Sequence, residues 1–168
     1  SISCNTDIKI TGGRIVDIGI FDEAGIDCSN KFISPGFIDI HTHGGYGFDF
    51  MDSTDEAFDS ILRFQLDNGT TTVLPTSVTA PVAAIKKFID TARKYKKKNP
   101  PFAKVFGVHL EGPYLSLKNR GAQKEEYILN PQKDDYSFIT DNKDIVRTVT
   151  ISPELDVNGA MTKCLSEN

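Results

Sequence analysis

The sequence has few cysteines, and their number and spacing exclude two classes of small protein. There are three in 168 residues, and Cys4, Cys28 and Cys164 lie far apart. A disulfide framework needs paired cysteines, and a zinc ribbon needs closely spaced pairs. We therefore expect neither, and we expect a reducing, cytoplasmic compartment.

The sequence also lacks long apolar runs and an excess of basic residues. No stretch approaches the roughly 18 apolar residues that a membrane span needs, and no basic segment followed by an apolar one predicts a secretory signal. Nineteen Lys and Arg against 23 Asp and Glu give a formal net charge of -4, which disfavours general binding to nucleic acid. We expect no partner that is a membrane or a nucleic acid.

The first part of the chain has the pattern of short strands. Asp7–Ile10 and Arg14–Ile18 alternate with a period of two around Gly12-Gly13, which predicts a hairpin, and Lys31–Ile33 predicts a further strand. Pro35-Gly36 is the strongest punctuation in the sequence. We predict a domain boundary there, with domains at 1–35 and 36–168.

From residue 36 onward, predicted strands alternate with predicted helices, which favours an α/β fold with a parallel sheet. The strands are Phe37–His41, Thr70–Leu74, Lys104–Leu110 and Ile145–Ile151, and the helices begin near Ser53, Pro81, Tyr136 and Asp156. Ser53 and Glu56 predict a capping box on the first helix, with Phe58, Ile61, Leu62 and Leu66 at helical spacing after it. Four units are too few to close a (β/α)8 barrel of about 250 residues. The fold is therefore a small open sheet or the first half of a barrel.

Half a barrel would leave apolar side chains in water. We expect the inward-facing residues to be Phe37, Val73, Val108 and Val149 or their neighbours, and we expect the last strand to present an unpaired edge. Such a chain should self-associate or pair with a separate second half.

The first cluster of functional interest is Asp39-Ile40-His41-Thr42-His43. Alternate residues of a strand share a side, so both imidazoles face one volume at the carboxyl end of the strand, where barrel enzymes keep their active sites. Imidazole suits zinc, iron and nickel. A metal site is one reading of the H-x-H pattern, and a hydrogen-bonded histidine pair in a polar strand end is the other.

The second cluster is His109-Leu110-Glu111-Gly112-Pro113, again at the end of an apolar strand. His109 and Glu111 share a face by the same alternation. A carboxylate can ligate a divalent metal, and a buried one needs a metal or a charged partner. Glu111 is therefore a candidate metal ligand or a salt-bridged strand terminus.

These segments carry a resemblance to a known family. Pro35 to Gly44 is similar to the first-strand signature of the amidohydrolase superfamily. The segment from His109 to Ser116, with Gly121-Ala122-Gln123 and Asn68 to Thr72, resembles the N-acetylglucosamine-6-phosphate deacetylases. The resemblance implies a (β/α)8 TIM-type barrel beside a small β-sandwich. The chain would then be the N-terminal half of the barrel, preceded by part of the sandwich at 1–35.

The resemblance also implies the chemistry and the residues that perform it. A divalent metal, zinc or iron, would position a water molecule for hydrolysis of the acetyl group of a small sugar phosphate. Glu111 matches the family's carboxylate metal ligand, and His41 and His43 match a pair that holds a second metal in some members. Ala122 and Gln123 match positions that contact substrate. Family members are commonly dimers, so we expect a homo-oligomer.

Several residues that the family needs have no match here. The catalytic Asp and two further metal-binding histidines would lie beyond Asn168, so the resemblance implies a truncated chain, inactive alone. Two alternatives stay open. One is an amidohydrolase acting on a cyclic amide, although no predicted strand ends in the lysine that bridges two metals in such enzymes. The other is a non-catalytic fragment or relic.

Overall fold

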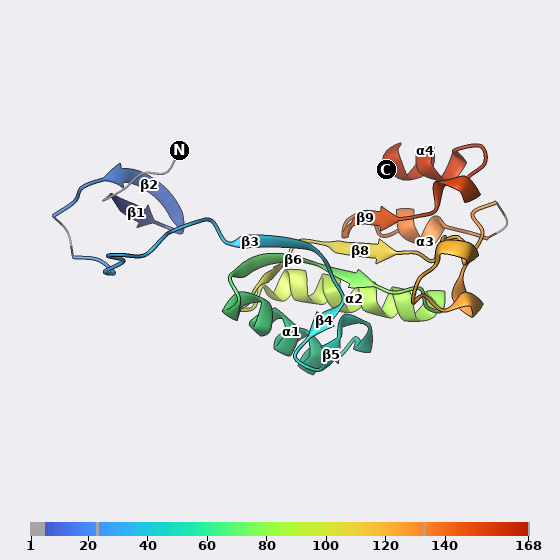
Figure 1. Cartoon of the computed structure of the whole chain (residues 1–168), viewed down its shortest axis with the longest axis horizontal. Coiled ribbons are helices and arrows are strands. Elements are labelled where there is room, and N and C mark those ends of the chain that lie inside the picture. Colours follow the sequence, from blue (N-terminus) through green and yellow to red (C-terminus); the bar gives the residue numbers. More distant parts are fainter. Residues whose placement is uncertain (1–5, 23, 133, 168) are drawn as a thin grey trace. The chain divides into compact units, whose positions relative to one another are not determined.

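The computed structural model describes residues 6–22, 24–132 and 134–167, and the chain divides into two compact units (Figure 1). The first unit is Ser1–Pro35 and the second is Gly36–Asn168. That the first unit forms part of a β-sandwich stays a prediction. Among the described residues, none of the helices combines the length and the apolar character needed to cross a bilayer.

The first unit contains the predicted hairpin. Strands β1 (Asp7–Thr11) and β2 (Arg14–Gly19) pair antiparallel around Gly12 and Gly13. Both glycines have positive φ, 58° and 73°, the conformation that a tight hairpin turn needs and that glycine adopts without strain. The strand expected at Lys31–Ile33 is wrong: the segment has no regular structure, and Phe32 is 95% exposed. Apolar alternation alone does not make a strand when no neighbouring strand takes its hydrogen bonds.

The second unit is built on a parallel sheet, as the sequence predicted. Its path runs through four strands in the order β3 (Phe37–Thr42), β6 (Thr70–Ser77), β8 (Val108–Glu111) and β9 (Val146–Thr150). The expected strand at Lys104–Leu110 is divided, because the short β7 (Lys104–Val105) pairs with β6 before β8 begins. A small hairpin of β4 (Gly44–Gly45) and β5 (Phe48–Asp49) follows β3.

Helices connect these strands. Figure 1 shows α1 (Asp55–Asp67) and α2 (Val82–Lys98) side by side against the sheet. The long connection from β8 to β9 contains α3 (Ser137–Thr140), and α4 (Ala160–Glu167) follows β9. The described residues of the unit also form single-turn 3-10 helices at Phe50–Asp52, Leu117–Asn119, Glu125–Tyr127 and Pro153–Leu155.

The predicted capping box on α1 is wrong by one residue. Thr54, not Ser53, is the N-cap, and its hydroxyl accepts a hydrogen bond from the Ala57 N–H at 3.2 Å. Ser53 is instead left-handed, with φ of 53°, at the end of the preceding 3-10 turn. The capping box belongs to that turn and is formed by Asp49 and Asp52.

The core lies between the sheet and helices α1 and α2. Its fully buried aromatic residues are Phe50, Phe58, Phe88, Tyr95 and Tyr114. The expected exposure of four inward-facing residues is confirmed for Phe37, which is 65% exposed, and wrong for Val73 and Val108, which are fully buried. Val149 packs partly buried against the core. Strand alternation directs Val73 and Val108 toward the helices, where they gain apolar contacts.

Candidate metal centre

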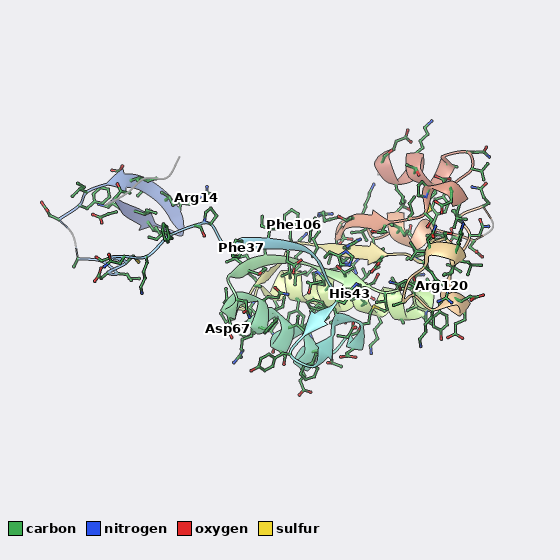
Figure 2. All side chains as sticks on the ribbon, in the orientation of Figure 1. Arg14, Phe37, His43, Asp67, Phe106 and Arg120 are labelled. Carbon is green, nitrogen blue, oxygen red and sulfur yellow. The ribbon has the colours of Figure 1, made fainter. Side chains whose placement is uncertain are left out.

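The strand order brings the two predicted clusters to one edge of the sheet. His41 lies in β3, His43 follows the end of that strand (Figure 2), and Glu111 is the last residue of β8. Because the strands are parallel, their carboxyl ends meet at the same edge. Strand β6 lies between them, and its residue at this level is the small Thr76, which pairs with His109 in the register.

Three side-chain atoms converge at this edge. Nε2 of His43 lies 3.0 Å from Oε2 of Glu111, and Nε2 of His41 lies 3.6 Å from the same oxygen. The two Nε2 atoms are 3.1 Å apart. One ligand atom from each of the three residues lies within 4.8 Å of the others, which is the arrangement of a group that can hold a metal ion.

The three side chains differ in their contact with solvent. The side chain of His41 is 49% exposed, that of His43 35% and that of Glu111 23%. Nδ1 of His43 is buried and has no hydrogen-bond partner among the described residues. The cluster is thus open enough for a small molecule to reach, while Glu111 is the most enclosed of its members.

The third histidine of the chain joins the cluster without belonging to the group of three. His109 is 4% exposed, and its ring lies edge-on to His41 with centroids 4.9 Å apart. Burial lowers the pKa of His109, and the neighbouring His41 lowers it further, while Glu111 opposes the shift. Burial therefore disfavours the charged form of this ring.

A layer of hydroxyl and amide groups supports the strand ends. The hydroxyl of Thr76 accepts from the Thr42 N–H at 3.1 Å and donates to the Leu74 carbonyl at 3.2 Å. Gln65, which is buried on α1, donates from Nε2 to the Thr42 hydroxyl at 3.3 Å. These contacts join a helix and two strands beneath the cluster.

Sequence reasoning missed Gln65, although a signal was present. Phe58, Ile61 and Leu62 are buried on one face of α1, and helical spacing continues that face to position 65. Leu66 was expected there because it is apolar, and it is 37% exposed. Spacing was thus a better guide than hydrophobicity at this position.

The predicted substrate-contact segment reaches the same edge of the sheet through Thr79. Oε1 of Gln123 accepts from the Thr79 N–H at 2.7 Å, and the Thr79 hydroxyl donates to the Glu111 carbonyl at 3.4 Å. Gly112 has φ of 81°, and a Cβ there would lie 2.3 Å from the Thr79 hydroxyl oxygen. Ala122, beside Gln123, is exposed. That Ala122 and Gln123 contact substrate stays a prediction.

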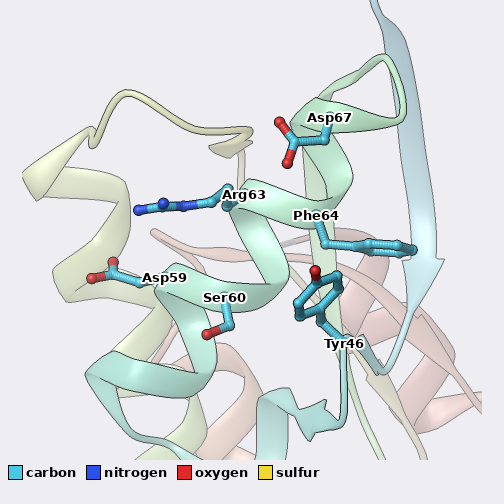
Figure 3. Close-up of a pocket in the computed structure, with 6 residues that line it drawn as sticks. All are labelled: Tyr46, Asp59, Ser60, Arg63, Phe64 and Asp67. Atoms are coloured by element: carbon cyan, nitrogen blue, oxygen red, sulfur yellow. The ribbon is translucent and has the colours of Figure 1, made fainter.

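Two surface hollows lie elsewhere in this unit. One, of about 340 Å³, is lined by Tyr46 and by residues of α1 (Figure 3). The other, of about 500 Å³, is lined by residues from α3, β9 and α4. Neither is lined by a residue of the histidine and glutamate cluster.

Comparison with known sequences identifies a family and a set of relatives. A sequence model of the amidohydrolase family matches residues 32–166. The N-acetylglucosamine-6-phosphate deacetylase of Mus musculus is 33% identical over 173 residues, covering 95% of this chain and 42% of the mouse protein. That of Bacillus subtilis (strain 168) is 32% identical over 143 residues, covering 83% of this chain and 36% of the relative. The chain therefore spans less than half the length of these relatives.

The solved structures that match this chain are of the same kind of protein as the relatives found by sequence. The N-acetylglucosamine-6-phosphate deacetylase of Thermotoga maritima matches with a TM-score of 0.77 and 29% identity, over 95% of this chain and 41% of that chain. A mutant of the Mycobacterium smegmatis deacetylase, in complex with N-acetyl-D-glucosamine-6-phosphate, matches with a TM-score of 0.72 and 28% identity, over 93% of this chain and 40% of that chain.

These matches confirm the predicted fold class, an α/β chain that corresponds to part of a TIM-type barrel. They also confirm the resemblance observed in the His41-x-His43 and Glu111-Gly112-Pro113 segments, since the family match spans both. The chain belongs to the amidohydrolase family.

Proposed function

We propose that this chain is part of a metal-dependent hydrolase that removes the acetyl group from N-acetylglucosamine 6-phosphate, releasing glucosamine 6-phosphate and acetate. The observation that carries the proposal is the convergence of His41, His43 and Glu111 at one edge of the sheet. The relatives named for this deacetylation support the substrate.

The donor atoms suit a divalent transition metal. With bonds of about 2.0–2.2 Å to a tetrahedral metal, neighbouring ligand atoms lie about 3.3–3.6 Å apart. The three atoms here are separated by 3.0, 3.1 and 3.6 Å. Two imidazoles and one carboxylate admit zinc, iron and several other divalent ions. The set of donors therefore fits the group that the family implies.

A bound metal of this kind supplies a water nucleophile near neutral pH and polarises a carbonyl group. The residues of this chain would hold it: Glu111 contributes the negative charge, and His41 and His43 contribute Nε2 lone pairs. Gln123, whose Oε1 is engaged by the Thr79 N–H, keeps its Nε2 group to donate to the substrate beside Ala122. Proton transfer to the leaving amine requires a further acid–base group, for which the family resemblance implies an Asp outside these 168 residues.

The proposal is tested by acetate release from N-acetylglucosamine 6-phosphate by the full-length protein, with metal content measured on the same sample. Glu111→Gln removes the charged ligand, so we expect loss of the metal and a fall in kcat/KM of at least about 100-fold. Glu154→Gln, an exposed carboxylate outside the cluster, is the matched control and should leave both unchanged. Unchanged turnover in Glu111→Gln would contradict the assignment. The chain of 168 residues by itself should release no acetate.

We also propose that the chain of 168 residues self-associates when it is isolated, and that the whole protein works in the cytoplasm. The exposed Phe37, Ile38 and Ile40 on β3 support self-association, because apolar side chains in water favour contact between copies. The three cysteines are odd in number and lie far apart in the sequence, which supports a reducing compartment. Sedimentation velocity tests the first point, and a purely monomeric species would contradict it.

A further inference from the structure

We propose that His109 is a positioning residue that holds His41 in place at the metal centre and is not itself a metal ligand. This inference rests on the proposed function, because it assigns a task within the same site.

The hydrogen bonds of His109 engage both ring nitrogens. Nε2 lies 2.7 Å from the Thr150 hydroxyl, and Nδ1 lies 3.4 Å from the Thr76 hydroxyl. An arrangement in which Thr76 donates to the Leu74 carbonyl, Nδ1 donates to Thr76 and Nε2 accepts from Thr150 gives each of these groups a partner. Both ring nitrogens are therefore occupied by threonine hydroxyls, and His109 is not among the residues whose ligand atoms converge at the cluster.

The position of the ring explains what it contacts instead. The rings of His109 and His41 meet edge to face, at 78° and with centroids 4.9 Å apart. The side chain of His41 is the most exposed of the cluster, whereas His109 is buried. Contact with the buried ring of His109 therefore restricts the orientation of the His41 ring.

The contacts thus form a chain across the sheet. Thr150 on β9 fixes His109 on β8, and His109 contacts His41 on β3. Residues behind a metal ligand set its orientation, and their loss typically lowers metal affinity by about 10–100-fold. The inference therefore predicts an effect on metal binding from Thr150, a residue outside the group of three.

The test is a titration of the metal-free full-length protein with Co²⁺, followed by the visible absorption of the bound ion. We expect His109→Leu to weaken Co²⁺ binding by about 10–100-fold. Thr150→Val, which removes only the hydroxyl, should weaken Co²⁺ binding several-fold. This variant replaces His109→Leu in the test if His109→Leu does not fold. His109→Gln, which keeps an amide near the Nε2 position, should bind more tightly than His109→Leu.

Thr148→Val is the matched control. Thr148 lies on the same strand as Thr150 and pairs with His109 in the register, and within the described part of the chain its side chain makes no hydrogen bond to that ring. Its Co²⁺ affinity should stay within about twofold of the wild type, because the same change two residues away leaves His109 fixed.

Three results would overturn the inference. If His109→Leu lowers the melting temperature but leaves Co²⁺ affinity unchanged, the role of the residue is purely structural. If His109→Leu abolishes binding while Thr150→Val behaves as wild type, His109 ligates the metal directly. If the wild-type protein binds no Co²⁺, the proposed metal site does not exist. Failure of acetate release with the expected Co²⁺ pattern would sink the proposed function alone.

Discussion

The two units of the chain differ in how much apolar surface each buries by itself. In the second unit, residues from Phe50 onward form one buried cluster between the sheet and its helices. Among the described residues of the first unit, eight large apolar side chains are more than half exposed: Ile10, Ile15, Val16, Ile18, Ile20, Ile26, Phe32 and Ile33.

The difference shows what a strand pattern needs in order to become a stable layer. A lone two-stranded hairpin has no second layer to cover its apolar face and is marginally stable in water. Four parallel strands with α1 and α2 against them bury a continuous core. Stability of this chain should therefore reside in the second unit.

The largest expected effect tests that difference directly. Phe58 is fully buried, with its ring 4.9 Å from the rings of both Phe50 and Tyr95. Phe58→Ala should lower the free energy of unfolding by about 3–5 kcal/mol, because it leaves a cavity among these rings. Ile18→Ala in the hairpin should change it by less than about 0.5 kcal/mol. Urea denaturation followed by circular dichroism measures both, and equal losses would break the comparison.

A smaller effect is expected at the beginning of α1, the helix that carries Phe58. Thr54→Ala removes the oxygen that accepts the Ala57 N–H, and should cost about 1 kcal/mol in the same denaturation experiment. Ser53→Ala should cost less, because the Ser53 hydroxyl contacts the Met51 carbonyl and no N–H of the helix. A larger loss of stability in Ser53→Ala than in Thr54→Ala would instead support Ser53 as the N-cap, as the sequence predicted.

The smallest effect is expected at α4, which contributes only Met161 to the fully buried core. Asp156 accepts hydrogen bonds from the Thr162 and Met161 N–H groups, at 2.8 and 3.2 Å. The bond from Thr162, followed by that from Met161, holds the pKa of Asp156 below its usual range. Asp156→Ala should therefore lower the melting temperature slightly at pH 7.

The pH dependence gives this last prediction its sign. A carboxyl group with a depressed folded-state pKa stabilises the protein above its unfolded pKa of about 3.9, and this contribution is lost as the pH falls through the folded value. The difference in melting temperature between wild type and Asp156→Ala should shrink as the pH is lowered below about 4. A difference that grows on acidification would contradict the role of the carboxylate.

Much of the local structure could be predicted because its causes are local. Gly12-Gly13 between alternating residues produced the hairpin, and Pro81, an apolar stripe and the final lysines bounded α2. Alternation along a strand also placed His41 and His43 on one side. The parallel order that brings Glu111 to them follows from the alternation of strands with helices.

What the sequence by itself determined was therefore the α/β class, the hairpin and the types of residue at the ends of the strands. Only the tertiary structure decided which side of the sheet the helices cover, and hence that Val73 and Val108 are buried. It also decided that Gln65 supports a strand end and that both nitrogens of His109 are engaged by threonines. These features depend on contacts between elements distant in sequence. The periodicity of one helix or strand does not predict which other elements pack against it.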